Sequence, residues 1–249
     1  MLELALILIA GFFCGGLNAV AGGGTFVTLP VLIWIGIPPV IANATATTMA
    51  VPGYCASAWA YRKDLRAEGT LRIGTIVMLA ALGGVLGAVL LVITPPDAFL
   101  QLVPWLLLAA TLLFAAAPKL PEFSRILGAG ASSPIGAGCL VLLVATYGGY
   151  FNGGLGIVML AVLSMQGYRN LHGMNGLKNV LSAVLSILSV MTFITADLIA
   201  WQVALPMALA NVCGAYVTSR IVRQRARTDI LRALIIAVGA TTTAIFFLV

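Results

Sequence analysis

One lysine of this 249-residue chain lies inside an apolar segment, where a charged side chain is unusual. Lys178 has polar neighbours at nearby positions of a predicted helix, namely Asn175, Asn179 and Ser182. If the segment lies in a membrane, the lysine either contacts an anion in the protein interior or extends to the nearer interface. The three polar neighbours favour contact with an anion.

A polar run at residues 43–48 is the second candidate for anion contact. Thr45 and Thr48 share a face at helical spacing, as do Asn43 and Thr47. Their hydroxyl and amide N–H groups are able to donate to anionic oxygens without adding charge. The same groups also form hydrogen bonds between helices in membrane bundles, so both roles stay open.

Two clusters of glycine each come directly before a short apolar segment, at residues 25–35 and 155–165. Each segment has 11 residues and predicts a helix of about 16 Å, roughly half the hydrocarbon thickness. A helix that begins inside a membrane has up to four unpaired N–H groups with partial positive charge, and glycine lets an anion approach them. Close helix packing is the alternative role of glycine. Pairs at the spacing typical of such packing are Gly11 and Gly15, Gly83 and Gly87, and Gly149 and Gly153.

Asn18 and Asn152 accompany the two glycine clusters, where they either cap the turns or contact a substrate. The predicted binding residues are Asn18, Gly22, Gly23, Gly24, Thr25, Asn43, Thr45, Thr47, Thr48, Asn152, Gly153, Gly154, Asn175, Lys178 and Asn179. His172 is a candidate for proton coupling, although a solvated loop histidine is the favoured interpretation.

The composition excludes most soluble classes of protein. Only 8% of the residues are charged, against roughly 25% in soluble domains, and 61% are hydrophobic. A soluble globule with so few charges could not cover its surface, so we predict an integral membrane protein with the lipid bilayer as its surroundings. The net charge of +6 comes from basic clusters between apolar segments, which indicates membrane topology and not a nucleic-acid partner.

The apolar segments repeat in the same order after a shift of roughly 130 residues. They lie at about residues 4–21, 25–35, 42–60, 73–93, 98–117, 135–150, 155–165, 174–193, 201–219 and 231–249. We therefore expect a single transmembrane domain, 1–249, with one repeat at about 1–120 and a second at about 130–249.

The charges of the loops predict that the two repeats have opposite orientations. Basic residues follow the third segment at Arg62, Lys63, Arg66 and Arg72, whereas the equivalent loop around Asp197 has none. The next pair is reversed, because the loop at 94–97 has no basic residue and its counterpart has Arg220, Arg223, Arg225 and Arg227. Equivalent loops would then face opposite sides of the membrane. The predicted fold class is an all-α integral membrane protein with two inverted-topology repeats of about five helical segments, including short half-helices.

Several of these motifs together resemble the TauE/SafE family, also called the sulfite exporter or toluene-sulfonate uptake permease family. The first half matches in GGLNAVAGGGT (15–25), LP (29–30), GIPP (36–39), NAT (43–45) and AYR (60–62), and the second in YGGYF (147–151), GLG (154–156) and NGLKN (175–179). Asn152 departs from the small residue expected at its place. The resemblance implies a multi-pass transporter of the bacterial inner membrane whose substrate is a small sulfur-containing anion, such as sulfite, a sulfonate or a related organosulfur acid.

The sequence also lacks the features of several alternatives. The carboxylates lie at segment ends or in loops, and no spacing indicates a metal site, a cofactor or a catalytic nucleophile, so we expect no enzyme. A uniporter is the simplest mechanism, and a cell that is negative inside favours export of an anion by about 2.3 kcal/mol per charge per 100 mV. Proton-coupled uptake of an organic anion and a non-transporting accessory subunit stay open, as does a homo-oligomer.

Overall fold

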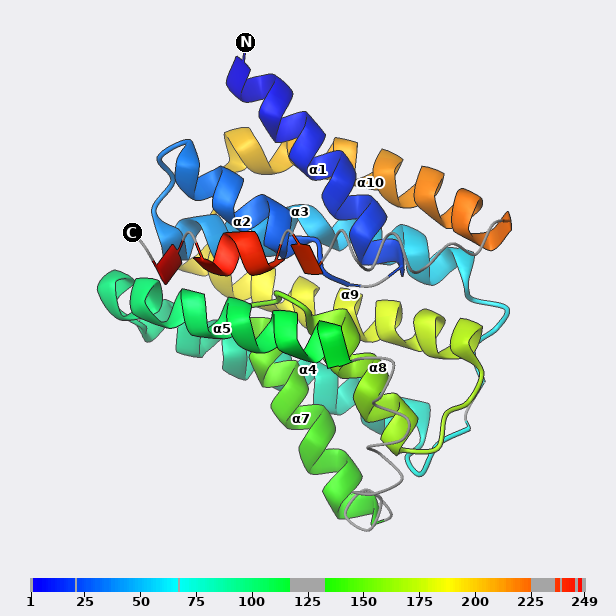
Figure 1. Ribbon diagram of the computed structural model, residues 1–249. Coiled ribbons are helices and arrows are strands. Elements are labelled where there is room, and N and C mark those ends of the chain that lie inside the picture. Colours follow the sequence, from blue (N-terminus) through cyan, green and yellow to red (C-terminus); the bar gives the residue numbers. More distant parts are fainter. Residues whose placement is uncertain are drawn as a thin grey trace.

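The chain folds into α-helices, and the part that the structure describes contains no β-strand (Figure 1). The computed structural model describes residues 2–20, 22–66, 68–116, 133–224, 236–237, 239–244 and 246–247. The helices with assigned bounds are α1 (Leu2–Val20), α2 (Thr25–Trp34), α3 (Pro39–Ala60), α4 (Ile73–Ile93), α5 (Pro96–Ala116), α7 (Pro134–Tyr150), α8 (Leu155–Met165), α9 (Leu171–Thr195) and α10 (Trp201–Gln224). The all-α prediction is confirmed for these residues.

The apolar segments of the sequence coincide with these helices, which bury some of their large apolar side chains and expose others. Two helices are long and apolar enough to cross a membrane by length and composition, Ile73–Ile93 and His172–Thr195. The helices α2 and α8 have only 10 and 11 residues, about 15–16 Å, which confirms that both are half-length. The tenth predicted segment, 231–249, lies mostly outside the described residues, as do Arg225 and Arg227.

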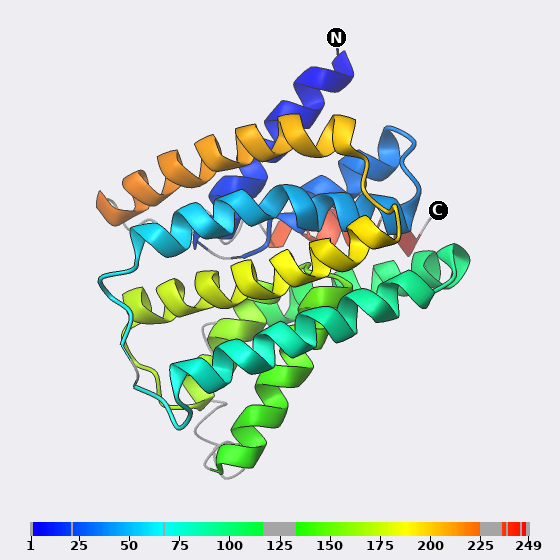
Figure 2. The ribbon, with the colours of Figure 1, turned by 180° about the vertical axis from the view of Figure 1, so that it is seen from behind.

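Four long helices lie side by side in the order α10, α3, α9, α4 (Figure 2). On one side of this row α1 packs on the outermost helix α10, and on the other side α7 packs on the outermost helix α4. The order of contacts is unchanged when α1 to α4 are exchanged with α7 to α10. The short helices α2 and α8 contact α3 and α9 respectively, and α5 contacts both α3 and α8.

The described loops next to the four long helices lie at the two opposite ends of these helices (Figure 2). The loop after α3 and the loop before α9 share one end, where the Thr70 N–H donates to the Gln166 carbonyl (3.2 Å) and the Glu68 carboxylate accepts from Arg169 N–H (3.2 Å). The turns α4–α5 and α9–α10 lie at the other end (Figure 2). The basic residues predicted after α3 therefore share an end with Arg169. At the end of α10, Arg220 and Arg223 belong to the helix, which is longer than the predicted segment.

Small residues allow the two outer helix pairs, α1 with α10 and α4 with α7, to approach closely. A Cβ atom at Gly15 of α1 would overlap with the Asn211 carbonyl oxygen of α10, and one at Gly149 of α7 would overlap with the Gly84 carbonyl oxygen of α4. Backbone-to-backbone contact of this kind is the packing role of glycine in membrane bundles. The packing interpretation of the spaced glycine pairs is confirmed at these positions.

Large apolar side chains cover much of the outside of the molecule. Those exposed by two thirds or more include Trp34 (71%), Trp59 (69%), Ile93 (68%), Ile135 (80%) and Leu209 (73%). Soluble monomers rarely expose extended apolar surface, so this outer surface is suited to lipid.

Candidate functional site

The two glycine turns meet in the interior of the protein. A Cβ atom at Gly22, before α2, would overlap with the backbone of Gly156 in the first turn of α8. Gly22 lies three residues before the start of α2, and Asn152 lies three residues before the start of α8. Gly22 has φ +82° and Asn152 has φ +60°. Both turns therefore place a left-handed residue at the same position, and the beginnings of both half-helices come together.

The room that glycine leaves in these turns is filled by protein atoms. A Cβ atom at Gly24 would overlap with the Cys14 Sγ and the Asn18 side chain, and one at Gly153 would overlap with the Phe151 ring. Packing thus explains these glycines in the structure described, and approach of an anion to them stays a prediction. Thr25 and Gly23 are buried beside them.

The two asparagines of the turns have different partners. The Gly24 N–H donates to Asn18 Oδ1 (2.8 Å), so Asn18 caps the turn before α2. Asn152 instead joins the two central helices, because its Oδ1 accepts from the Tyr54 hydroxyl of α3 (3.1 Å) and its Nδ2 donates to Ser186 Oγ of α9 (3.4 Å). The sequence left capping and substrate contact open for both residues, and the structure provides a hydrogen-bonding role within the protein for each.

Lys178 is completely buried, with an exposed fraction of 0%. Its Nζ donates to the backbone carbonyl of Asn18 (3.3 Å) at the end of α1, so the side chain does not extend to the surface. Among the residues that the structure describes, it is the one charged side chain that is buried, and none of their carboxylates pairs with it. The hydrogen-bond partner of the amine within the described ranges is thus a neutral carbonyl. We call Asn18, Tyr54, Asn152, Lys178 and Ser186 the polar centre.

Further polar side chains lie on the same face of α9 as Lys178. At 100° per residue, the positions span an arc of about 100°. They are Asn175, Lys178, Asn179, Ser182, Ser186 and Ser189. Asn179 is fully buried, and neither of its amide atoms is hydrogen-bonded to a described residue. The atoms Ser182 Oγ and Asn175 Oδ1 are also buried and have no hydrogen-bond partner among the described residues. Because buried polar groups nearly always have partners, these atoms indicate a place for a ligand or water.

The run at 43–48 has mainly structural hydrogen bonds. Asn43 Nδ2 donates to the Tyr150 carbonyl (2.8 Å) and Thr45 Oγ1 accepts from Ala200 N–H (3.0 Å), so both join α3 to the second half of the chain. Thr48 Oγ1 donates within its own helix to Ala44. The interhelical interpretation is confirmed for Asn43, whereas the partner of Thr45 lies in the loop between α9 and α10. Asn43 Oδ1 lacks a partner among the described residues, and Thr47 is buried.

His172 lies in the first turn of α9 with an exposed side chain. Its ring stacks on Tyr61 at 6.3 Å between centroids. This is the solvated position favoured from the sequence, and its participation in proton coupling stays a prediction.

Sequence reasoning missed Tyr54 and Ser186, which complete the polar centre. Tyr54 stands in an apolar stretch, and no feature of its neighbours sets it apart. Ser186 could have been found, because Ser182, Ser186 and Ser189 continue the helical spacing that begins at Asn175.

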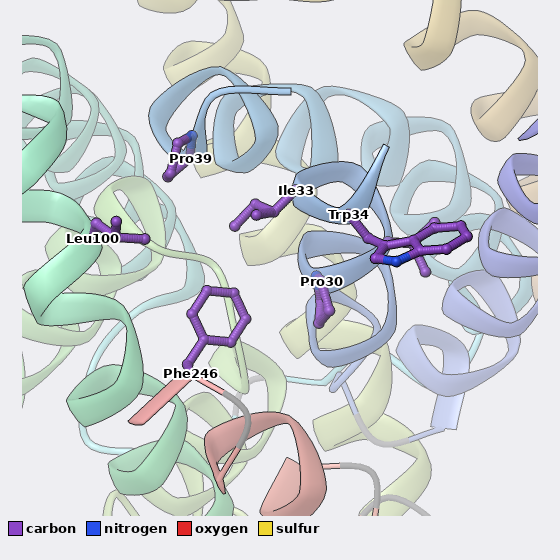
Figure 3. Close-up of a pocket in the computed structure, with 7 residues that line it drawn as sticks. Pro30, Ile33, Trp34, Pro39, Leu100 and Phe246 are labelled. Atoms are coloured by element: carbon purple, nitrogen blue, oxygen red, sulfur yellow. The ribbon is translucent and has the colours of Figure 1, made fainter. Parts of the chain in front are cut away.

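A separate cavity of about 550 Å³ lies between α2, the start of α3 and α5 (Figure 3). Its labelled lining residues are Pro30, Ile33, Trp34, Pro39, Leu100 and Phe246. None of them has a polar group suited to orienting an anion except the Trp34 N–H, so we place the candidate site at the polar centre instead.

Comparison with known proteins agrees with the motifs. The family described as "Sulfite exporter TauE/SafE" matches residues 7–246. A "Probable membrane transporter protein" of Haemophilus influenzae is 30% identical over 243 residues, 97% of this chain and 93% of the relative. The "Probable membrane transporter protein ORF9" of a Sinorhizobium species is 28% identical, covering 87% and 82% of the two chains. The "Probable membrane transporter protein YfcA" of Escherichia coli K12 is 26% identical, covering 98% and 89%.

These names indicate a membrane-located transporter of a small molecule rather than an enzyme. Because the match extends over nearly the whole sequence, the chain belongs to the sulfite exporter TauE/SafE family of membrane transporters.

Proposed function

We propose that this protein exports a small sulfur-containing anion across the bacterial inner membrane, as a multi-pass transporter with a site between its two halves. The observation that carries the proposal is Lys178, a buried lysine without a described carboxylate partner. It lies about 10 Å along α9 and contacts Asn18, next to the place where the two glycine turns meet. A buried charge in a membrane protein is expensive and is normally kept for function.

The arrangement of the helices supports alternating access by two inverted halves. The row α10, α3, α9, α4 and its flanking helices α1 and α7 keep their contacts when the halves are exchanged. The loop after α3 and its counterpart after α9 lie at opposite ends of the long helices, as inverted repeats require (Figure 2). Rocking of one half against the other would expose the polar centre to each side of the membrane in turn.

Export is supported by the positions of the acidic residues. The carboxylates within the described ranges, Glu3, Asp64, Glu68, Asp97 and Asp197, lie at helix ends or in loops. None of them is placed to carry a proton through the interior. A uniported anion leaves a cell that is negative inside with a gain of about 2.3 kcal/mol per charge per 100 mV.

Flux measurements in proteoliposomes test the proposal. The purified protein is reconstituted with sulfite or a short alkanesulfonate inside, and efflux is followed under an imposed voltage and, separately, under an imposed pH gradient. We expect voltage-driven efflux that Lys178→Met abolishes. The matched control is Lys63→Met, which removes an exposed lysine from the loop after α3 and leaves efflux unchanged.

Two other results would overturn the proposal. Flux that responds only to the pH gradient would identify a proton-coupled permease for organic anions, with His172 as the first residue to replace. Absence of flux for every anion, with the protein folded in the bilayer, would identify a membrane accessory subunit.

A further inference from the structure

We infer that four arginines at one end of the long helices bind the phosphate group of an anionic phospholipid in the adjoining membrane leaflet. They are Arg62, Arg66 and Arg72 of the loop between α3 and α4, and Arg169 of the loop between α8 and α9, and we call them the arginine patch. This lipid site is separate from the polar centre, and it does not depend on what the protein transports.

Hydrogen bonds between the two loops bring arginines of both halves of the chain to one place (Figure 2). The Glu68 carboxylate accepts from the backbone N–H groups of Arg169 (3.2 Å) and Asn170 (3.3 Å). The Thr70 N–H donates to the Gln166 carbonyl (3.2 Å). Arg169 of the second half therefore lies beside the loop that contains the other three arginines.

The arginines flank the two helices that are long and apolar enough to cross a membrane. Arg72 directly precedes Ile73–Ile93, and Arg169 lies three residues before His172–Thr195. Arginines at the ends of membrane helices extend into the headgroup region, where the phosphate groups of lipids lie. All four arginines of the patch are exposed, so their guanidinium groups are accessible from this region.

Positive charge is in excess at this end of the molecule. Residues 61–72 and 166–173 together contain five basic residues and two carboxylates, a net charge of +3 with His172 neutral. One of the carboxylates, Glu68, already accepts from two backbone N–H groups. Basic clusters beside membrane helices attract anionic lipids, and the planar guanidinium group donates to two phosphate oxygens at once.

The environment of Arg62 favours a lipid over a soluble phosphate. Its guanidinium carbon lies 4.2 Å from the centre of the Trp59 ring, and its Nη1 donates to the Trp59 carbonyl (2.7 Å). Arginine has five N–H donors, so others are left for a phosphate group. Trp59 is exposed in the last turn of α3, and tryptophan is enriched at the boundary between membrane and water. The pair therefore presents a cation and an apolar ring together, which matches the phosphate and the adjoining acyl chains of one lipid.

Titration with short-chain phospholipids in detergent tests the inference on the unmodified full-length protein. Dioctanoyl phosphatidylglycerol and dioctanoyl phosphatidylcholine have the same acyl chains and differ in the charge of the headgroup. We expect phosphatidylglycerol to bind tighter by roughly tenfold or more and to lose affinity as the salt concentration is raised. Inorganic phosphate, added as a competitor at the same concentration, should displace little of the bound phosphatidylglycerol, because it has no acyl chains to contact the apolar surface.

Variants of exposed residues then locate the site. Arg62→Gln combined with Arg169→Gln should weaken phosphatidylglycerol binding by roughly fivefold for each arginine, because each removes one charge at the membrane surface. Trp59→Leu should weaken it by roughly two- to fivefold, because Arg62 loses the ring that orients it. The matched control is Trp34→Leu, which replaces an exposed tryptophan at the end of α2 and should bind both lipids as the unmodified protein does.

Three results would overturn the inference. They are equal affinity for the two lipids, a preference for phosphatidylglycerol that the double arginine variant retains, and full displacement by inorganic phosphate, which would identify a site for the free anion. Each of them leaves the proposed function untouched, because the titration measures lipid binding and the proposed function is tested by flux of a sulfur-containing anion.

Discussion

Asn152 is a residue whose backbone and side chain both have defined tasks. Its left-handed conformation, φ +60°, is one that asparagine tolerates better than other residues with a Cβ atom. Its amide connects Tyr54 of α3 with Ser186 of α9. At the equivalent place in the first half, Gly22 has the same type of conformation but no side chain, and its Cα region lies against Gly156. The two turns are thus held in place by different means.

Replacement of Asn152 separates these two tasks. Asn152→Gly keeps the conformation and loses two hydrogen bonds, which should lower the free energy of unfolding by about 1–3 kcal/mol. Asn152→Ala loses the same bonds and adds a left-handed alanine, for a further cost of about 1–2 kcal/mol. Thermal unfolding in detergent should therefore rank the alanine variant below the glycine variant. The reverse order would mean that backbone strain is unimportant at this turn.

Lys178 should be needed for function and not for folding. Its ammonium group is buried with a neutral carbonyl as its described partner, so its removal relieves an uncompensated charge. We expect Lys178→Met to unfold at the same temperature as the unmodified protein or a higher one when no anion is present. A large loss of stability would show that the hydrogen bond to Asn18 holds α1 to α9 and would assign Lys178 a structural role.

At the scale of elements, contacts between α1 and α10 and between α4 and α7 depend on glycine. At Gly149 the neighbouring backbone is too close for any side chain, because a Cβ atom would overlap with Gly84 of α4. At Gly138, on the same helix, a Cβ atom would be 3.5 Å from Leu79 Cδ1, an ordinary contact. Helix α7 therefore contains one glycine that packing requires and one that it does not.

Alanine substitutions on α7 make this difference measurable. Gly149→Ala should destabilise the protein by about 1–3 kcal/mol, because α7 must move away from α4. Gly138→Ala should be neutral or stabilise by up to about 1 kcal/mol, because alanine favours the helix. Unfolding temperatures of the two variants, purified in the same detergent, provide the comparison. Equal effects would contradict the close approach of the two helices.

At the scale of the whole molecule, the two ends of the long helices should face opposite sides of the membrane. The loop after α3 contains Arg62 and Lys63, and it shares an end with the loop before α9. The turns α4–α5 and α9–α10 lie at the other end (Figure 2). Asp97 belongs to the first turn of α5, and Asp197 lies between α9 and α10. By the positive-inside rule, we expect the basic end to be cytoplasmic.

Single-cysteine labelling tests this orientation. In a background without the native cysteines, Asp97→Cys and Asp197→Cys should react with a membrane-impermeant maleimide in intact cells. Lys63→Cys should react only after the membrane is permeabilised. Labelling of Lys63→Cys and Asp197→Cys from the same side would contradict the inverted arrangement of the two halves.

The sequence by itself determined the helical class, the half-length of α2 and α8, the polar neighbours of Lys178 on α9 and the family. These properties depend on local features: the length of an apolar stretch, the glycines that interrupt it, and the position of a charge within it. The end of α10 was predicted too early, because a basic residue such as Arg223 continues a helix as readily as it begins a loop.

Only the tertiary structure decided which atoms those residues meet. Tyr54 and Asn152 are 98 residues apart, and Lys178 and Asn18 are 160 apart, so no local pattern predicts either hydrogen bond. The glycines are equally ambiguous in sequence, because a missing side chain makes room for an anion or for another backbone. At Gly22 and Gly149 the room is taken by a helix from the other half, and that choice depends on how the two halves pack together.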